Sequence, residues 1–300
     1  MISERLVSGL AKQTYNPNML WKGRRQSDNI EDRRGMSPGV VAGGGLGAVI
    51  LAVVVMLMGG NPGDILNSAV QGGGKPGTYT PTPEEEERKE FVGVILADTE
   101  DVWNDQFRKI GRTYQHPKLI LFSGRVDSAC GLASAASGPF YCPADSNVYI
   151  DLSFFNELQN RFGAPGEFAQ AYVVAHEVGH HVQNLLGTNQ KLAQARKTMT
   201  EEQYNRISVR LELQADFYAG VWANHTQQMK NVINEKDIED AMRAASAIGD
   251  DRIQMESQGY TVPDAFTHGT SEQRVRWFMK GWKSGDIRQG DTFSVSDREL

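Results

Sequence analysis

The fold is centred on the stretch Ala171–Gly187, which reads AYVVAHEVGHHVQNLLG. Its apolar residues recur at helical spacing and Gly187 is a natural C-cap, so a helix over residues 167–186 is predicted. Residues 176–180 within it read HEVGH and fit the pattern HExxH. Positions i and i+4 face the same side of a helix, so both imidazoles can reach one metal ion. Charged groups in such an apolar helix need a metal or a charged partner to offset their desolvation.

The residue types of this motif point to zinc-dependent hydrolysis. Zinc lowers the pKa of a bound water toward about 7, and a neighbouring carboxylate can then accept the proton of that water. We therefore predict one bound Zn²⁺ ion, with His176 and His180 as ligands and Glu177 as the catalytic base. The alternative is a surface helix with solvated histidine and glutamate side chains, which the apolar flanks of the motif disfavour.

A catalytic zinc site also needs a third protein ligand, and several patterns compete for it. The metzincin pattern HExxHxxGxxH would require glycine at position 183 and histidine at position 186. The chain has Gln183 and Leu186 there, so that pattern fails. A second set of candidates consists of Asp216, His181 and His225.

The gluzincin pattern supplies the remaining candidate, a glutamate on a downstream helix followed four residues later by an aspartate. Glu212 and Asp216 fit this spacing, and their neighbours in the sequence are apolar. We favour Glu212 as the third ligand, with Asp216 holding the imidazole of His176 in its metal-binding tautomer. The fourth position is then open to water, as a catalytic site requires.

A second long apolar stretch lies upstream of this region. No charged residue occurs between Arg34 and Asp64, and Val40–Met58 reads VVAGGGLGAVILAVVVMLM. A helix of that length spans about 28 Å, close to the hydrocarbon core of a bilayer, so a transmembrane helix over residues 40–58 is predicted. A buried core helix and a cleaved signal peptide are the alternatives. The Gly-rich sequence that follows and the late start of the stretch disfavour them.

The flanking charges predict an orientation. Residues 1–39 carry seven Lys or Arg, whereas residues 64–90 carry three. The positive-inside rule then puts the N-terminal arm in the cytoplasm and the C-terminal part in the periplasm or outside the cell. The expected localisation is the inner (cytoplasmic) membrane, in a single-pass arrangement.

Composition and cysteine content agree with that expectation. The formal net charge is −6, which does not favour nucleic-acid binding. The two cysteines are Cys130 and Cys142, twelve positions apart. Outside the cytoplasm such a pair is expected to form a disulfide, and two free buried thiols are the alternative.

The chain divides into four predicted regions. Residues 1–39 form a basic arm, 40–58 the transmembrane helix, 59–89 a Gly/Pro-rich and acidic linker, and 90–300 the folded catalytic domain. The predicted fold class is α+β, mostly helical with a small sheet, preceded by one transmembrane helix. Helices are expected over residues 90–110, 167–186, 200–224, 236–248 and 271–282. Strands are expected over residues 119–122, 140–141 and 148–152.

The sequence also resembles a known family over nearly its whole length. The segments that carry the resemblance are WKGRRQSDNIEDRRG from Trp21, GPFYCPAD around Cys142, HEVGHHVQ, ELQADFYAG and HGTSEQRVRWF. They are similar to those of the predicted neutral zinc metallopeptidases of bacterial membranes. The resemblance implies a single-pass protein with a gluzincin-like catalytic domain, and it implies no defined substrate.

Two further segments are candidate parts of a site. Residues 267–274 read THGTSEQR and resemble a stretch in CAAX-type proteases, where a histidine near zinc can stabilise the oxyanion of peptide hydrolysis. We therefore predict a catalytic role for His268, and a structural histidine at a helix N-terminus is the alternative. Phe140–Tyr141 is either an edge strand for an extended substrate or a disulfide-tied hairpin.

The function predicted from the sequence is a membrane-anchored zinc metallopeptidase, an endopeptidase that acts on a peptide or protein. The alternative from another class is a membrane-tethered binding or assembly protein whose zinc is structural. Four protein ligands would mark that alternative, because structural zinc sites are closed. A zinc hydrolase with a non-peptide substrate is also compatible with the motifs. Oligomeric state has no signal in the sequence.

Overall fold

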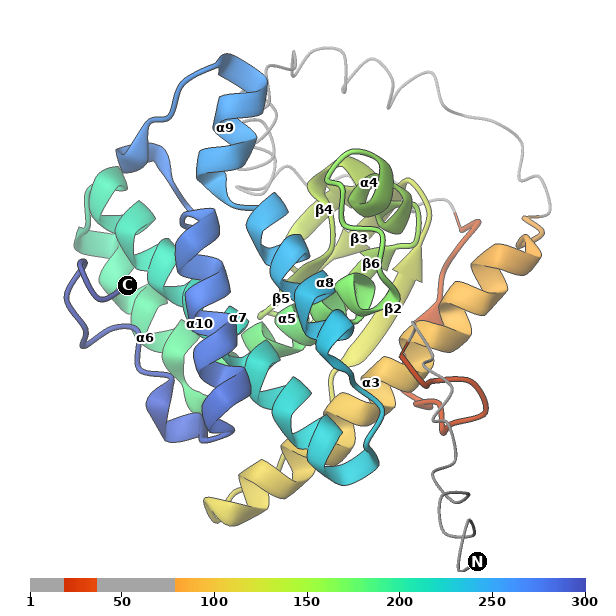
Figure 1. The fold of residues 1–300 in the computed structure, drawn as a ribbon. Helices are drawn as coiled ribbons and strands as arrows, with labels where there is room; N and C mark the ends of the chain where they lie inside the picture. Colours follow the sequence, from red (N-terminus) through yellow and green to blue (C-terminus); the bar gives the residue numbers. More distant parts are fainter. Residues whose placement is uncertain (1–18, 37–78) are drawn as a thin grey trace, which may run out of the picture.

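A computed structural model describes residues 19–36 and 79–300 of the chain (Figure 1). The helices in these ranges are α3 (Pro83–Lys109), α4 (Phe154–Asn160), α5 (Glu167–Leu186), α6 (Thr188–Ala195), α7 (Glu201–Lys230), α8 (Glu235–Ala247), α9 (Asp250–Gln258) and α10 (Ser271–Ser284). The strands are β1 (Ile30–Asp32), β2 (Lys118–Phe122), β3 (Arg125–Ser128), β4 (Gly131–Ser134), β5 (Phe140–Cys142) and β6 (Asn147–Asp151). The described fold is therefore mostly helical, with a small mixed sheet.

The main sheet has the strand order β1-β2-β6-β5. Strands β1, β2 and β6 run parallel, and β5 pairs antiparallel with β6 at the end of the sheet. The central strands are apolar and buried throughout their middle residues, as expected for strands covered on both faces. Strands β3 and β4 form a separate antiparallel hairpin.

Helix α5 lies between the sheet and the C-terminal helices α7, α8 and α10 (Figure 1). Glycines allow these helices to approach closely. A Cβ atom added at Gly179 of α5 would lie 2.9 Å from the carbonyl oxygen of Ala215 in α7. A Cβ atom at Gly281 of α10 would collide with the carbonyl oxygen of Phe217 on another face of α7. Helix α7 is therefore packed tightly between its two neighbours.

Local sequence signals explain where the long helices begin and end. Helices α3, α7, α8 and α10 each start with a capping box, in which the N-cap side chain and the third helical residue bond to each other's backbone N–H. Helix α5 ends at Gly187 with a φ of 87°, a left-handed conformation that favours glycine. The predicted helix over residues 167–186 is confirmed.

The N-terminal segment 19–36 is part of the folded body, beside α3 (Figure 1). The Trp21 side chain is 4% exposed and packs edge-on against Phe91, with ring centroids 5.4 Å apart. Strand β1 then adds itself to the sheet beside β2. This segment thus contributes both a core side chain and a strand.

Ion pairs hold the same segment against α3. The Arg24 guanidinium pairs with the buried carboxylate of Asp98, and the Arg25 guanidinium lies 3.1 Å from a carboxylate oxygen of Glu100. The Arg34 side chain is almost fully buried and pairs with Asp32 at 2.6 Å. Within residues 19–36, the predicted N-terminal arm is thus packed against the body, and its predicted location in the cytoplasm stays a prediction. Residues 19–36 and the body from residue 79 onward therefore form one folded unit.

The fold-class prediction is also corrected in its membrane part. In the described ranges, no helix combines the length and apolar character that a membrane crossing requires. The stretch 40–58, for which the transmembrane helix was predicted, lies outside these ranges. The predicted linker 59–89 lies partly outside them as well. Its last residues are helical instead, because α3 already starts at Pro83.

Trp21→Ala is expected to lower the free energy of unfolding by about 3 kcal/mol, the usual cost of emptying an aromatic site in a core. The neighbouring variant Leu20→Ala is the matched control, since the Leu20 side chain is 51% exposed. Its effect should stay within about 0.5 kcal/mol. Urea unfolding of both variants checks this, and a Trp21→Ala protein as stable as the wild type would show that the segment does not belong to the core.

Candidate metal centre

Three of the predicted site residues come together between α5 and α7. The Nε2 atom of His176 lies 3.1 Å from one carboxylate oxygen of Glu212, and the Nε2 atom of His180 lies 3.4 Å from the other. One ligand atom from each of the three side chains lies within 4.8 Å of the others. Donor atoms around a tetrahedral zinc ion at bond lengths of about 2.0–2.1 Å are about 3.4 Å apart. The observed spacing therefore fits a zinc ion.

The electrostatics of this cluster favour a cation. Burial raises the pKa of the Glu212 carboxyl, but the imidazoles of His180 and His176 outweigh this effect, so the pKa lies well below its usual range. Burial lowers the pKa of His176, but the carboxylates of Asp216 and Glu212 outweigh it and raise the pKa to about 10. The carboxylates of Glu212 and Asp216 thus favour a positive charge at the imidazoles, whether a proton or a metal ion carries it.

The aspartate one turn after Glu212 orients the first imidazole. The Nδ1 atom of His176 lies 2.8 Å from Oδ1 of Asp216, whose side chain is fully buried. When Nδ1–H donates to this carboxylate, the lone pair of His176 is on Nε2, the atom that faces Glu212. This is the contact predicted for Asp216, and carboxylate–histidine pairs of this kind raise the basicity of a metal ligand.

Two residues that sequence analysis missed complete this buried network. The Arg274 guanidinium donates from Nε to Oδ2 of Asp216 at 2.8 Å and from Nη2 to Oδ1 at 3.0 Å. The Tyr172 hydroxyl also donates to Asp216. Burial raises the pKa of the Asp216 carboxyl, but Arg274 and His176 outweigh it, so the group stays ionised.

The second imidazole has a partner of its own. The Nδ1 atom of His180 lies 2.9 Å from Oε1 of Gln183, and the amide of Gln183 donates to the carbonyl oxygen of Leu211 at 2.6 Å. Gln183 is fully buried. The sequence analysis considered Gln183 only as a mismatch to the glycine of the metzincin pattern. Its position one helical turn after His180 was the signal that could have revealed its role.

The catalytic base predicted from the motif lies beside this cluster. The Glu177 side chain is 8% exposed, and burial raises the pKa of its carboxyl. A cavity of about 1000 Å³ is lined by His176, Glu177, His180 and Glu212 together with many apolar side chains. The three candidate ligands and the candidate base thus face one large open space, of a size that suits an extended ligand.

His268 lines the same cavity but is not among the clustered metal donors. Its side chain is 52% exposed, and its Nδ1 atom lies 3.1 Å from Oδ1 of Asp250. Burial lowers the pKa of His268, but the hydrogen bond to Asp250 outweighs it and the net shift is upward. The other oxygen of Asp250 accepts the backbone N–H groups of residues 267–269. Asp250, which sequence analysis missed, therefore fixes the loop that carries His268.

The alternative third ligands have other partners. The Nε2 atom of His225 lies 2.7 Å from the carbonyl oxygen of Gly285. His181 contacts the hydroxyl of Tyr141 and the carbonyl oxygen of Gln115, and burial lowers its pKa to about 4. Asp216 reaches the cluster through His176. Glu212 is the carboxylate that shares the donor cluster with the two motif histidines.

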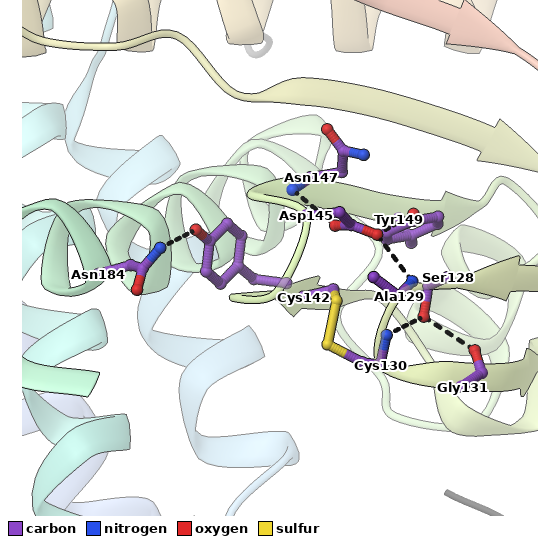
Figure 2. The surroundings of a disulfide bond; sticks show 10 residues. Ser128, Ala129, Cys130, Gly131, Cys142, Asp145, Asn147, Tyr149 and Asn184 are labelled. Carbon is purple, nitrogen blue, oxygen red and sulfur yellow. Dashed lines mark hydrogen bonds between the residues drawn. A yellow bond between two sulfur atoms is a disulfide. The ribbon is translucent and has the colours of Figure 1, made fainter. Parts of the chain in front are cut away.

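The predicted disulfide is present. Cys130 and Cys142 are bonded, with their Cα atoms 5.8 Å apart (Figure 2). The bond ties the turn between β3 and β4 to the last residue of β5. The Oδ2 atom of Asp145 accepts from the backbone N–H of Ala129 at 2.9 Å and from the hydroxyl of Tyr149 at 2.8 Å, which joins the same loop to the sheet.

A comparison with known protein families identifies the family of this chain. Residues 19–293 match the model of a family described as "putative neutral zinc metallopeptidase". The chain belongs to this family. The match begins in the docked N-terminal segment and ends after α10, so it includes every residue of the cluster described above.

Several relatives are similar over long stretches. The chain is 50% identical over 290 residues to uncharacterized protein YpfJ of Escherichia coli K12, covering 93% of this chain and all of that protein. It is 46% identical over 194 residues to uncharacterized protein Rv2575 of Mycobacterium tuberculosis, covering 61% of this chain and 64% of that protein. No solved structure matches the chain.

Asp216→Asn is expected to weaken zinc binding by a factor of about 10–100, the usual effect of losing the carboxylate behind a ligating histidine. The amide lacks the charge that Arg274 and His176 now share. Competition with a chelating dye measures the affinity. The control Glu201→Gln removes an exposed acid from the same helix and should leave the affinity unchanged. Equal affinities for all three proteins would refute the role of Asp216.

Proposed function

We propose that this chain is a zinc-dependent endopeptidase of the gluzincin type, with His176, His180 and Glu212 as the metal ligands. One observation carries the proposal. Two imidazole nitrogens and a carboxylate, with ligand atoms within 4.8 Å of one another, face a cavity that also holds the carboxyl group of Glu177. Membership of the zinc metallopeptidase family supports the same activity.

A zinc ion in this site would polarise the scissile carbonyl group and acidify the attacking water. Glu177 accepts the proton of that water as attack begins and delivers it to the leaving amine nitrogen as the peptide bond breaks. Its burial suits this role, because a carboxylate with a raised pKa is a stronger base. Gln183 and Asp216 keep the two imidazoles in one tautomer throughout.

His268 is proposed to stabilise the negative charge that develops on the carbonyl oxygen. Its Nδ1 atom is held by Asp250, so Nε2 is the nitrogen left to donate into the cavity. The carboxylate of Asp250 favours the protonated ring, which is the form that donates. A hydrogen bond aimed at the developing oxyanion is one of the stronger contributions available to such a site.

Several features support a polypeptide substrate. The cavity has a volume of about 1000 Å³ and a largely apolar lining, at the upper end of the size of small-molecule sites. Residues Phe140 and Tyr141 of β5 line it, and β5 is the end strand of its sheet. An extended peptide could add to this edge through its main chain. The predicted edge strand and the disulfide-tied hairpin are therefore compatible with each other.

A structural zinc protein is less well supported. A structural site is normally closed by four protein ligands, and three donors gather in the described part of the chain. A body that functions outside the reducing cytoplasm remains a prediction. The disulfide between Cys130 and Cys142 supports it, because such bonds persist in oxidising compartments.

Glu177→Gln is expected to lower kcat on labelled casein by a factor of about 10²–10⁴. The amide keeps the shape of the side chain but cannot accept a proton, so one zinc ion per chain should still bind. Glu239→Gln, at an exposed position of α8, is the control and should keep the activity of the wild type. Full activity of Glu177→Gln, or loss of activity only together with loss of zinc, would refute the assigned role.

His268→Ala is expected to lower kcat by about 100-fold, within the range found when one oxyanion donor is removed. KM should change little, because the proposed contact strengthens only as charge develops on the oxygen. His116→Ala removes an exposed loop histidine and provides the comparison. Steady-state kinetics give kcat and KM for both variants and so test whether His268 contributes to the chemical step. Equal kcat values in both would assign His268 to the loop structure alone.

A further inference from the structure

The end strand of the sheet lies along the candidate active site. Strand β5 pairs on one side with β6, and its other edge has no strand partner among the described residues. Residues Pro139, Phe140, Tyr141 and Pro143, in and around this strand, line the cavity that contains the metal donors. The position of this edge relative to α5 therefore determines how far a bound main chain would lie from the metal ligands.

A chain of hydrogen bonds joins the middle of this strand to the metal-binding helix. The Tyr141 hydroxyl lies 3.0 Å from Nδ1 of His181 and accepts a hydrogen bond from the side-chain amide of Asn184 at 2.9 Å. Figure 2 shows Asn184 on its helix, pointing toward the strand that carries Cys142. Helix α5 thus contacts the strand through two side chains one turn apart.

The polarity of this chain is fixed by its far end. The Nε2 atom of His181 lies 2.6 Å from the carbonyl oxygen of Gln115, which can only accept. Nε2 therefore carries the proton of a neutral ring, and Nδ1 accepts from the Tyr141 hydroxyl. The hydroxyl donates its proton to His181 and accepts a hydrogen bond from Asn184. His181 is 1% exposed, which shields the contact from water.

Other contacts hold the rest of the strand but do not reach α5. The Phe140 ring stacks on Tyr149 of β6, with centroids 4.7 Å apart, and Cys142 is bonded to Cys130. His180 and His181 are neighbours in the same turn of α5. The imidazole of His180 faces the metal cluster, and that of His181 faces the strand. The Tyr141 contact is where these two parts meet.

We propose that His181 is a positioning residue, which acts through Tyr141 to set the distance between the β5 edge and the metal-binding helix. An extended substrate main chain that pairs with β5 is thereby aligned with the point of cleavage. This proposal rests on the proposed peptidase function. It gives the second histidine of HEVGHH a role in substrate alignment, separate from metal binding and from the chemistry itself.

The test is Tyr141→Phe in the full-length, zinc-loaded protein, with labelled casein as substrate. The ring stays and only the hydroxyl is lost. KM should rise about five- to tenfold, as expected when one buried hydrogen bond is removed. The kcat value should stay within about twofold, and zinc content should stay at one ion per chain, because no metal ligand or catalytic group is changed.

The matched control is Tyr149→Phe, which removes a hydroxyl from the neighbouring strand, where its partner is Asp145. Its KM should equal that of the wild type. Asn184→Ala removes the other hydrogen bond of the Tyr141 hydroxyl and should raise KM in the same direction, which gives a second variant if Tyr141→Phe unfolds. The double variant should raise KM little more than the stronger single variant, because both changes disrupt the same hydrogen-bonded network around the Tyr141 hydroxyl.

The outcomes separate the two proposals. Cleavage by the wild type with equal KM values for Tyr141→Phe and Tyr149→Phe would overturn the alignment role alone. A fall in kcat without a rise in KM would also overturn it, since the link would then act on the chemical step. Failure of the zinc-loaded wild type to cleave casein or a mixed peptide library would overturn both the peptidase function and this inference.

Discussion

The close crossing of α5 and α7 is the constraint on which the rest of the structure depends. Gly179 sits inside the HExxH motif, and any side chain there would press on the backbone of Ala215. The absence of a Cβ atom lets the two helices touch. Each helix carries functional residues four positions apart, so the contact brings residues 176 and 180 opposite residues 212 and 216. One backbone contact therefore sets the geometry of the whole cluster.

The charged groups around this crossing are costly to bury and depend on one another. Asp216 and Arg274 are both almost fully buried, and removing either would leave an uncompensated charge in the interior. Because Asp216 is ionised, it accepts the Nδ1 proton of His176 in a hydrogen bond and leaves Nε2 free to face the metal position. The network thus connects α10 to α5 through α7, and the core and the site are built from the same residues.

Sequence analysis predicted the parts of the site that follow local rules. The HExxH spacing and the Glu212–Asp216 spacing both rely on helical periodicity; the structure clusters His176, His180 and Glu212 and places Asp216 behind His176. Arg274 and Asp250 could not be found in this way, because their contacts join elements 58 and 18 residues apart. Strand β1 was missed for a similar reason, since three residues gain stability only by pairing with β2. The pairing of Arg24 and Arg25 with acids of α3 could not be predicted either, because these partners lie more than 70 residues apart in the chain.

X-ray absorption at the zinc edge tests the central claim most directly. The full-length protein, loaded with one equivalent of zinc and separated from free metal, should retain the ion. Its spectrum should fit four nitrogen or oxygen ligands at about 2.0–2.1 Å, with the multiple-scattering signature of two imidazoles and no sulfur. A protein that retains no zinc, or a spectrum with fewer than two imidazoles, would contradict the account of the α5–α7 site.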